Sequence, residues 1–318
     1  NMRYAAIHRV LRDVTTCLVN LRSVSIMIGR TKIVNMNNKP KIVVSLTTMP
    51  NRVQYLHNTL NSLANQSLKV DSIELNIPLK YRRSDLGEVN VSDIPQGFNV
   101  YRCTDYGPAT KLIPTLKRYQ KDDVIIIYCD DDRIYHEKWV ERLVNTHTRN
   151  PGCCVFEEGA DIPYHFRIIY KNFFYRLKRI ASFGLWKPFK KNLQNTHLVE
   201  GYGGVLITPK MFDERVFKVP DEFIFVDDMW FSANLTRNKI PLVRSRKSRL
   251  QRSRKVIVDG VDLGGMRGSL KTAVLDNMKR HELDVIAINT AIETMGIWPE
   301  YQTILSDALK AYRRSDIA

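Results

Sequence analysis

Short apolar runs alternate, in the first half of the chain, with segments that are apolar on one side only. Leu56, Leu60 and Leu63 recur at the spacing of a helix. The runs around them are too short for isolated helices and are rich in β-branched residues, so we expect strands there. A strand, a helix and a second strand in this order predict a parallel sheet. The expected strands are 42–46, 72–77, 98–103 and 124–128.

The run 124–128 is apolar at every position, as a central strand covered on both faces should be, and it ends on Asp130, Asp131 and Asp132. Ligands bind at this edge of open α/β sheets, and three adjacent carboxylates are unfavourable without a cation. Hard oxygen ligands suit Mn²⁺ or Mg²⁺, which commonly bring a phosphate. The alternatives are a solvated acidic cluster, or Asp132 capping a helix that begins near Tyr135.

The segment from Asp105 to Pro114 leads into this strand. Gly107 allows a sharp turn and a close approach to a ligand, Pro108 suits a first helical position, and Lys111 follows one turn later. A helix N-terminus together with a lysine makes an anion site. An ordinary helix start with a solvated lysine remains the alternative.

Two later segments carry further candidates. Glycines precede an apolar strand expected at 203–207, and they either let a bulky ligand lie against the backbone or form a bulge. Asp227 and Asp228 then stand among apolar residues, where burial and a like charge would separate their pKa values, as a general base requires. Alternatively, Asp227 caps the helix that contains Trp230.

The net charge of +16 implies an anionic partner, such as nucleic acid, a membrane surface or a phosphorylated substrate. Residues 165–192 interleave basic and aromatic side chains without an acid, and 237–255 form a second basic run. The glycine-rich segment 259–268 around Arg267 suits a loop that closes over phosphates, or a plain linker. Residues 1–34 follow helical spacing with basic positions, which fits a docked helix or one lying on anionic lipid.

Five cysteines, an odd number without zinc spacing, favour free thiols and a reducing compartment. The sequence has neither an apolar run of membrane-spanning length nor a signal-peptide pattern. We therefore expect a cytoplasmic protein, either soluble or peripheral on the inner face of a membrane.

Taken together, the order of these features resembles the GT-A fold family of nucleotide-sugar-dependent glycosyltransferases, closest to the broad family 2 type, over roughly residues 41 to 235. The resemblance rests on the first strand with its threonines, the segment at Asp105, the strand ending in Asp130 to Asp132, the strand at 203–207, and the pair Asp227 and Asp228. It implies an α/β fold with a mixed, mostly parallel sheet flanked by helices. It also implies helical extensions at both ends.

The resemblance further implies a metal-dependent, inverting transfer of a sugar from a nucleotide-sugar to a hydroxyl of a glycan. The donor expected first is a UDP-sugar. The base would be Asp227 or Asp228, although such enzymes commonly carry Glu-Asp there. The implied metal ligands are Asp132, Asp130 and, as the only late histidine, His281. The implied acceptor contacts are Tyr202, Gly203, Gly204 and Trp230. The implied donor contacts are Thr47, Thr48, Arg52, Asp105, Gly107, Lys111, Asp130, Asp131 and Arg267.

The domain prediction that follows has three parts: a basic helical extension at 1–40, a catalytic domain at 41–245, and a loop with helices at 246–318. The catalytic domain would divide into a donor half at about 41–135 and an acceptor half at about 150–245. The acceptor would be anionic, lipid-linked or at a membrane, and no specific nucleic acid is expected. The rival functions are a nucleotidyltransferase and a non-enzymatic protein that binds nucleic acid or anionic membranes.

Overall fold

The computed structural model describes residues 40–83, 87–165, 181–182, 196–265, 274–275, 278–303 and 305. Residues from Lys41 onwards form one compact unit, and the description below concerns this unit. The predicted N-terminal helix and nearly all of the basic aromatic stretch 165–192 lie outside the described residues. In the described part, no helix combines the length and apolar character needed to cross a bilayer.

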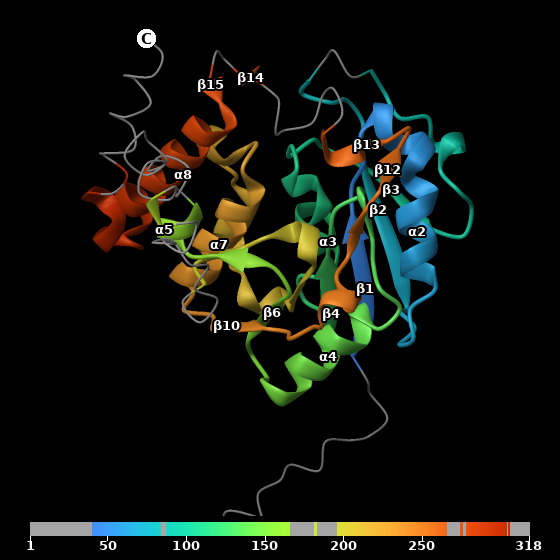
Figure 1. Cartoon of the computed structure of the whole chain (residues 1–318), viewed down its shortest axis with the longest axis horizontal. Helices are drawn as coiled ribbons and strands as arrows, with labels where there is room; N and C mark the ends of the chain where they lie inside the picture. The colour runs from blue at the N-terminus through green and yellow to red at the C-terminus, as the bar shows by residue number, and fades with distance from the viewer. Residues whose placement is uncertain are drawn as a thin grey trace, which may run out of the picture. The chain divides into compact units, whose positions relative to one another are not determined.

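A seven-stranded sheet forms the centre of the unit, in the order β10-β6-β9-β4-β1-β2-β3 (Figure 1). Within it β9 runs antiparallel to both of its neighbours, β4 and β6, and the other pairings are parallel. This confirms the predicted mixed, mostly parallel sheet. The strands are β1 Lys41–Leu46, β2 Ser72–Pro78, β3 Asn99–Cys103, β4 Val124–Tyr128, β6 Cys154–Phe156, β9 Val205–Ile207 and β10 Leu242–Arg244.

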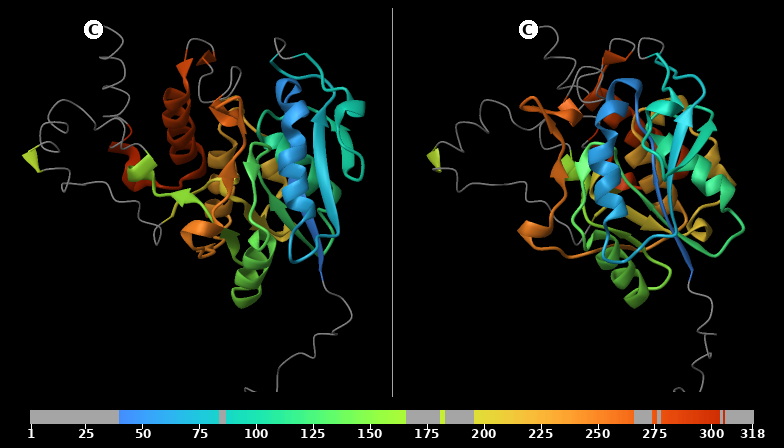
Figure 2. Two further views of the ribbon diagram at one scale, coloured as in Figure 1. Left: turned by 45° about the vertical axis from the view of Figure 1, so that its right-hand side comes forward. Right: turned by 90° about the vertical axis from the view of Figure 1, so that its right-hand side faces the viewer.

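Helices cover both faces of this sheet (Figure 1, Figure 2). Alternate residues of β4 point to opposite faces, so that Ile126 packs with one set of helices and Ile127 with the other. The first set comprises α3 Ile113–Arg118, α7 Asp227–Arg237 and α8 Arg280–Met295. The second comprises α2 Leu56–Ala64 and α4 Trp139–Arg149. A further helical turn is α5 Ile162–His165.

Among the described residues, four two-stranded ribbons lie outside the main sheet, and two of them lie close to each other in sequence. The strand after the aspartates pairs antiparallel with a strand from the basic run, and a hairpin follows directly. The first pair is β5 Arg133–Ile134 with β11 Arg254–Lys255, and the hairpin is β12 Ile257–Val258 with β13 Val261–Asp262. The others are β7 Gly159–Ala160 with β8 Leu198–Val199, and β14 Val274–Leu275 with β15 Met278–Lys279.

Three local predictions differ from the structure. The helix expected from Pro108 is a 3₁₀ turn at Ala109–Lys111, and α3 begins only at Ile113. Asp132 caps no helix, because α4 begins at Trp139 with Lys138 at its N-cap. Asp227 is not a cap either. It is the first residue of α7 and follows the N-cap Val226, so its carboxylate is available for other contacts.

Candidate active site

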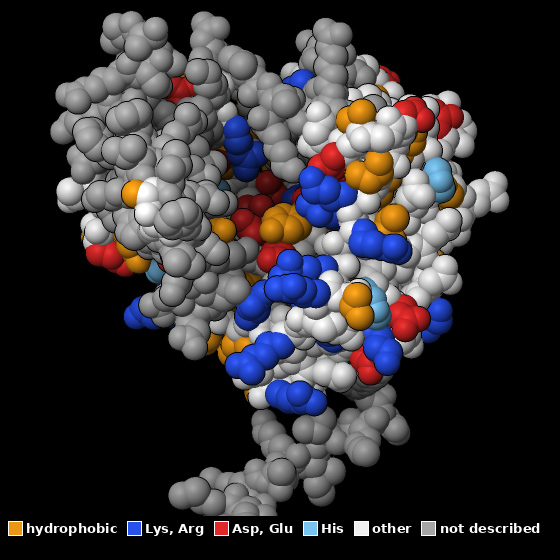
Figure 3. All heavy atoms as spheres, in the orientation of Figure 1, with side chains coloured by type: hydrophobic (Ala, Val, Ile, Leu, Met, Phe, Trp, Pro, Cys, Tyr) orange, Lys and Arg blue, Asp and Glu red, His pale blue; other side chains and the backbone are white. Residues whose placement is uncertain are grey.

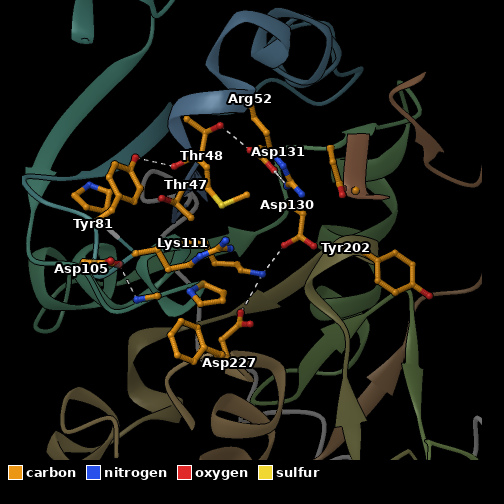
Figure 4. Close-up of a pocket in the computed structure, with 18 of the residues that line it drawn as sticks. Thr47, Thr48, Arg52, Tyr81, Asp105, Lys111, Asp130, Asp131, Tyr202 and Asp227 are labelled. Atoms are coloured by element: carbon orange, nitrogen blue, oxygen red, sulfur yellow. Dashed lines mark hydrogen bonds and ion pairs between the residues drawn. The ribbon is translucent and has the colours of Figure 1, made fainter. Parts of the chain in front are cut away.

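A cavity of about 280 Å³ opens at the carboxyl ends of the parallel strands β1, β2 and β4 (Figure 4). These ends share one edge of the sheet, which is where open α/β sheets bind ligands. In Figure 4, Tyr81 and Asp105 lie on one side of the cavity and Tyr202 on the other, with Asp130 between them. Most of the predicted site residues line it: Thr47, Thr48, Arg52, Asp105, Gly107, Lys111, Asp130, Asp131, Asp132, Tyr202, Asp227 and Asp228.

Lys111 connects the two acidic clusters of the cavity. Its ammonium forms ion pairs with Asp130 and, at 3.0 Å, with Asp227 Oδ2, and the side chain is buried (Figure 4). Burial alone would lower the pKa of Lys111, but the surrounding carboxylates raise it well above its ordinary value. Burial raises the pKa of Asp130, but the same ammonium together with Arg133 and Arg52 outweighs that effect, and the pKa of this carboxyl is lowered. Lys111 is therefore a fixed, fully charged cation.

Asp131 holds the loop after β1 in place. Thr48 Oγ1 donates a hydrogen bond to Asp131 Oδ2 at 2.6 Å, and Arg52 Nη1 donates to Oδ1 at 2.8 Å. Thr59 Oγ1 donates to the Asp131 carbonyl at 2.7 Å, and Tyr81 donates its phenolic proton to the Thr48 carbonyl at 2.9 Å. Because both carboxylate oxygens have protein donors, Asp131 shapes the cavity wall.

Asp132 has a different environment from its neighbour. It is buried, and its Oδ1 atom accepts no hydrogen bond; the nearest cationic atom is Arg133 Nε at 3.4 Å. Burial, followed by the charges of Asp130 and Asp131, raises the pKa of Asp132 to about 6. Gly264 packs against it so closely that a Cβ there would lie 2.4 Å from Asp132 Oδ2. Asp132 Oδ1 is therefore a buried acceptor that has an ion-pair contact with Arg133 but no hydrogen bond, although a buried polar atom normally has one.

The donor set determines which kind of metal site the cavity allows. Among the described residues, no three His, Cys, Asp or Glu side chains converge to hold a metal ion unaided. Asp130 and Asp132 nevertheless line one cavity, and Mg²⁺ in nucleotide enzymes often takes only one or two carboxylates together with phosphate oxygens and water. The residues fit a metal that binds together with phosphates. His281 belongs to α8, but its side chain lies outside the described part of the chain.

Asp227 and Asp228 differ in what they contact. Asp227 pairs with Lys111, whereas Asp228 Oδ1 accepts a hydrogen bond from the Gly201 amide at 2.9 Å. Burial and then the Asp227 charge raise the pKa of Asp228 well above its ordinary value. A Cβ at Gly201 would lie 2.9 Å from Lys111 Nζ and 3.2 Å from Asp228 Oδ1, so a larger residue there would displace these side-chain ends. Asp228 is thus an oriented carboxyl with raised proton affinity.

Asp105 and Gly107 form the turn that places Lys111 in the cavity wall. Asp105 Oδ1 accepts from the Gly107 amide, and Oδ2 accepts from the Arg82 amide, both at 2.7 Å. Gly107 has a φ of 60°, and a Cβ on it would lie 2.2 Å from the Ile224 carbonyl oxygen. The close approach predicted at Gly107 is therefore made to the protein's own backbone.

Three predicted acceptor residues do not line the cavity. Trp230 is buried in the core, where its indole donates to the Val216 carbonyl at 2.9 Å. Gly204, with a φ of 88°, lies against the ring of Trp139, and Gly203 lies against Glu158. The small size of Gly203 and Gly204 allows close internal packing, and Trp230 belongs to the core, so in this structure none of the three faces the cavity.

Tyr202, the fourth predicted acceptor residue, does line the cavity, and the guanidinium of Arg133 lies 4.6 Å from its ring centroid. Arg267 falls outside the described residues. Several lining residues were not predicted from the sequence. Tyr81 and Arg82 come shortly after β2, as Thr47 comes after β1, and this position after a strand is the signal that could have indicated them. Arg280, at the start of α8, also lines the cavity, but the sequence around it gives no indication of this role. Its Nε donates a hydrogen bond to Asp284 Oδ1 at 2.9 Å.

No protein-family profile matches the sequence, and no curated protein matches it. Among solved structures, the chain is similar to a mannosyltransferase from Pyrobaculum calidifontis in complex with GDP-Man and Mn²⁺ (14% identity over 89% of this chain and 76% of that one, TM-score 0.49). It is also similar to glucosyl-3-phosphoglycerate synthase of M. tuberculosis, with 14% identity over 81% of this chain and 81% of that one and a TM-score of 0.39. A third similar structure is S. aureus TarS 1–349, with 12% identity over 85% of this chain and 80% of that one and a TM-score of 0.42. At such identities and TM-scores, these likenesses establish neither an activity nor a substrate.

Proposed function

We propose that the chain is a metal-dependent, inverting glycosyltransferase that moves a sugar from a nucleoside-diphosphate sugar to an acceptor hydroxyl. One observation carries the proposal: a single cavity holds Asp132, a buried carboxylate with an oxygen that accepts no hydrogen bond, together with Asp228, an oriented carboxyl of raised pKa. The first is suited to a cation that arrives with phosphates, and the second to a proton from a hydroxyl.

The donor would lie along the edge formed by β1, β2 and β4. Its nucleoside would occupy the side lined by Thr47, Tyr81 and Asp105, and its diphosphate the side at Asp130 and Asp132. A divalent ion bound there would supply charge to stabilise the departing diphosphate. Arg52, held by Asp131, adds a cation to the wall.

The chemistry itself needs one base. As the acceptor oxygen forms its bond to the anomeric carbon, the bond from that carbon to the diphosphate oxygen breaks, and Asp228 takes the hydroxyl proton. Lys111 stands between this base and Asp130, so its positive charge lies near both the proton transfer and the leaving group. Asp227 keeps that cation in position.

A thermal-shift panel tests donor binding. Nucleoside diphosphates and nucleotide-sugars, beginning with UDP and GDP, would be added with and without Mn²⁺, and nucleoside triphosphates would be added in parallel. We expect at least one to raise the melting temperature in a Mn²⁺-dependent manner, because a ligand that binds only the folded state stabilises it. Nucleotidyltransferases are the second candidate, and a response to nucleoside triphosphates alone would favour them. A response to no nucleotide would contradict both.

A further inference from the structure

Exposed aliphatic side chains gather in one short segment of the described chain. Leu250 is 92% exposed, Ile257 56% and Val261 51%, and all three lie within residues 246–262, which we call the basic hairpin segment. The other large apolar side chains that stand out in this way, among the described residues, are Leu79 and Val91. Scattered exposed leucines need no explanation, but a local cluster does.

The hairpin geometry places two of these side chains on opposite faces. Ile257 pairs with Asp262, and Val258 pairs with Val261. Since directly paired residues share a face and successive residues alternate, Ile257 and Val261 point to opposite sides of the ribbon. Asp259 and Gly260 form a tight turn with φ values of 49° and 78°. Folding back onto the domain would cover only one face, whereas insertion among lipid headgroups would cover both.

The charges of the basic hairpin segment indicate that its binding partner is anionic. Its exposed cations outnumber its acids, and one acid, Asp262, is already paired with Lys255. The other acid, Asp259, lies at the turn. Figure 3 shows Lys and Arg side chains, with apolar ones among them, beside the hollow in which acidic side chains gather. The exposed cations are Arg246, Arg249, Arg252, Arg254 and Lys255.

The base of the hairpin is attached to the cavity. The Val256 amide donates to the Asp132 carbonyl at 3.0 Å, and the Leu263 amide donates to the Val256 carbonyl at 3.0 Å. Gly264, two residues after the hairpin, lines the cavity next to Asp132. A partner that binds the hairpin is therefore held close to the cavity mouth.

We propose that the basic hairpin segment docks on an anionic lipid bilayer, with its aliphatic side chains in the headgroup region and its cations on the lipid phosphates. This deepens the proposed function, on which it rests in one respect: the bilayer would present the acceptor hydroxyl to Asp228. Recognition of the surface itself requires neither donor nor metal.

The test is co-sedimentation of the full chain with vesicles of phosphatidylcholine alone or with about a third phosphatidylglycerol, without nucleotide. We expect binding to the anionic vesicles only. Replacing Arg249, Arg252 and Arg254 by Ser should weaken it by roughly fivefold per charge at low salt. Replacing Leu250, Ile257 and Val261 by Asn should weaken it at least about tenfold.

Matched controls lie away from the segment. Lys69 and Lys121 are exposed cations that precede β2 and β4, at the edge of the sheet opposite the cavity, and Val91 is an exposed aliphatic residue. Lys69→Ser, Lys121→Ser and Val91→Asn should bind vesicles like the unmodified protein. Three results would each overturn the proposal. The first is equal binding to neutral and anionic vesicles, and the second is an equal loss of vesicle binding in the control variants. The third is a loss of binding when the three arginines are replaced but none when the three aliphatic residues are replaced, which indicates charge attraction alone. Vesicle binding without any Mn²⁺-dependent nucleotide response would instead contradict only the glycosyltransferase function.

Discussion

Replacing Asp132 by Asn should make the protein more stable and inactive at the same time. The folded state holds this carboxylate buried, with an oxygen that accepts no hydrogen bond and with the negative charges of Asp130 and Asp131 nearby. A rise in its pKa from the ordinary 3.8 to about 6 corresponds to about 3 kcal/mol of folding free energy at neutral pH. Asn has nearly the same shape and removes the charge, so we expect a gain of roughly 2–3 kcal/mol.

The sign of the pH dependence follows from the direction of the shift. The folded pKa is above the unfolded one, so the unfolded chain releases this proton first and the folded state loses stability as the pH rises from about 4 to about 6. Below that window both states are protonated at Asp132, and the variant should match the unmodified protein. Above pH 6 the difference should be constant. Urea unfolding at pH 4 and pH 7.5 measures it.

The neighbouring residue provides a control of opposite sign. Asp131 has donors on both oxygens, from Thr48 and Arg52, so Asp131→Asn leaves the partly buried Arg52 without its carboxylate and should cost about 3 kcal/mol. Saturating Mn²⁺ with a nucleoside diphosphate should stabilise the unmodified protein by about 3 kcal/mol at a hundred times its Kd, but not Asp132→Asn. Asp132→Asn that loses stability at pH 7.5, or keeps the metal response, would refute this account of the cavity.

Other substitutions separate the roles of the remaining groups. Asp227→Asn should lower stability by about 1–3 kcal/mol in urea unfolding, because buried Lys111 loses a partner, whereas Asp228→Asn should be neutral or stabilising yet slow turnover at least a hundredfold; equal effects would contradict the assignment of the base. The initial rate should fall as the pH is lowered, at a pH well above the pKa of an ordinary aspartate, because Asp228 becomes protonated there. An initial rate that stays unchanged down to pH 4 would exclude Asp228 as the base. Gly201→Ala should reduce kcat about tenfold with little change in melting temperature, because its Cβ would displace Lys111 Nζ and Asp228 Oδ1; full activity would show that this contact is unimportant.

The elements that could be predicted are those whose signal is local. Strands β2 and β4 are buried at every position and β1 at every position after Lys41, so their short runs rich in apolar residues indicated them to within a residue or two. Strands β6 and β10 have only three residues each, too few for a period to be visible. Their place in the sheet depends on pairing with β9 and with each other, which is a tertiary property.

The site divides in the same way. Asp130 to Asp132 were found because carboxylates directly after a buried strand are unusual, and Asp227 and Asp228 because they interrupt an apolar run. Gly204 and Trp230 pack inside the protein, but the sequence could not distinguish this role from ligand contact, since glycine and tryptophan are common in both. Arg280 reaches the cavity only because α8 packs on α7, and no pattern near it indicates that contact.

The products of the reaction test the central claim most directly. The purified chain would be incubated with Mn²⁺ and either UDP- and GDP-sugars or nucleoside triphosphates, with and without acceptor alcohols. Free nucleoside diphosphate, nucleoside monophosphate and pyrophosphate would be quantified. The proposed function predicts Mn²⁺-dependent release of a nucleoside diphosphate, abolished in Asp132→Asn and slowed at least a hundredfold in Asp228→Asn. Release of pyrophosphate from nucleoside triphosphates instead, or release from nucleotide-sugars that both variants retain, would contradict it.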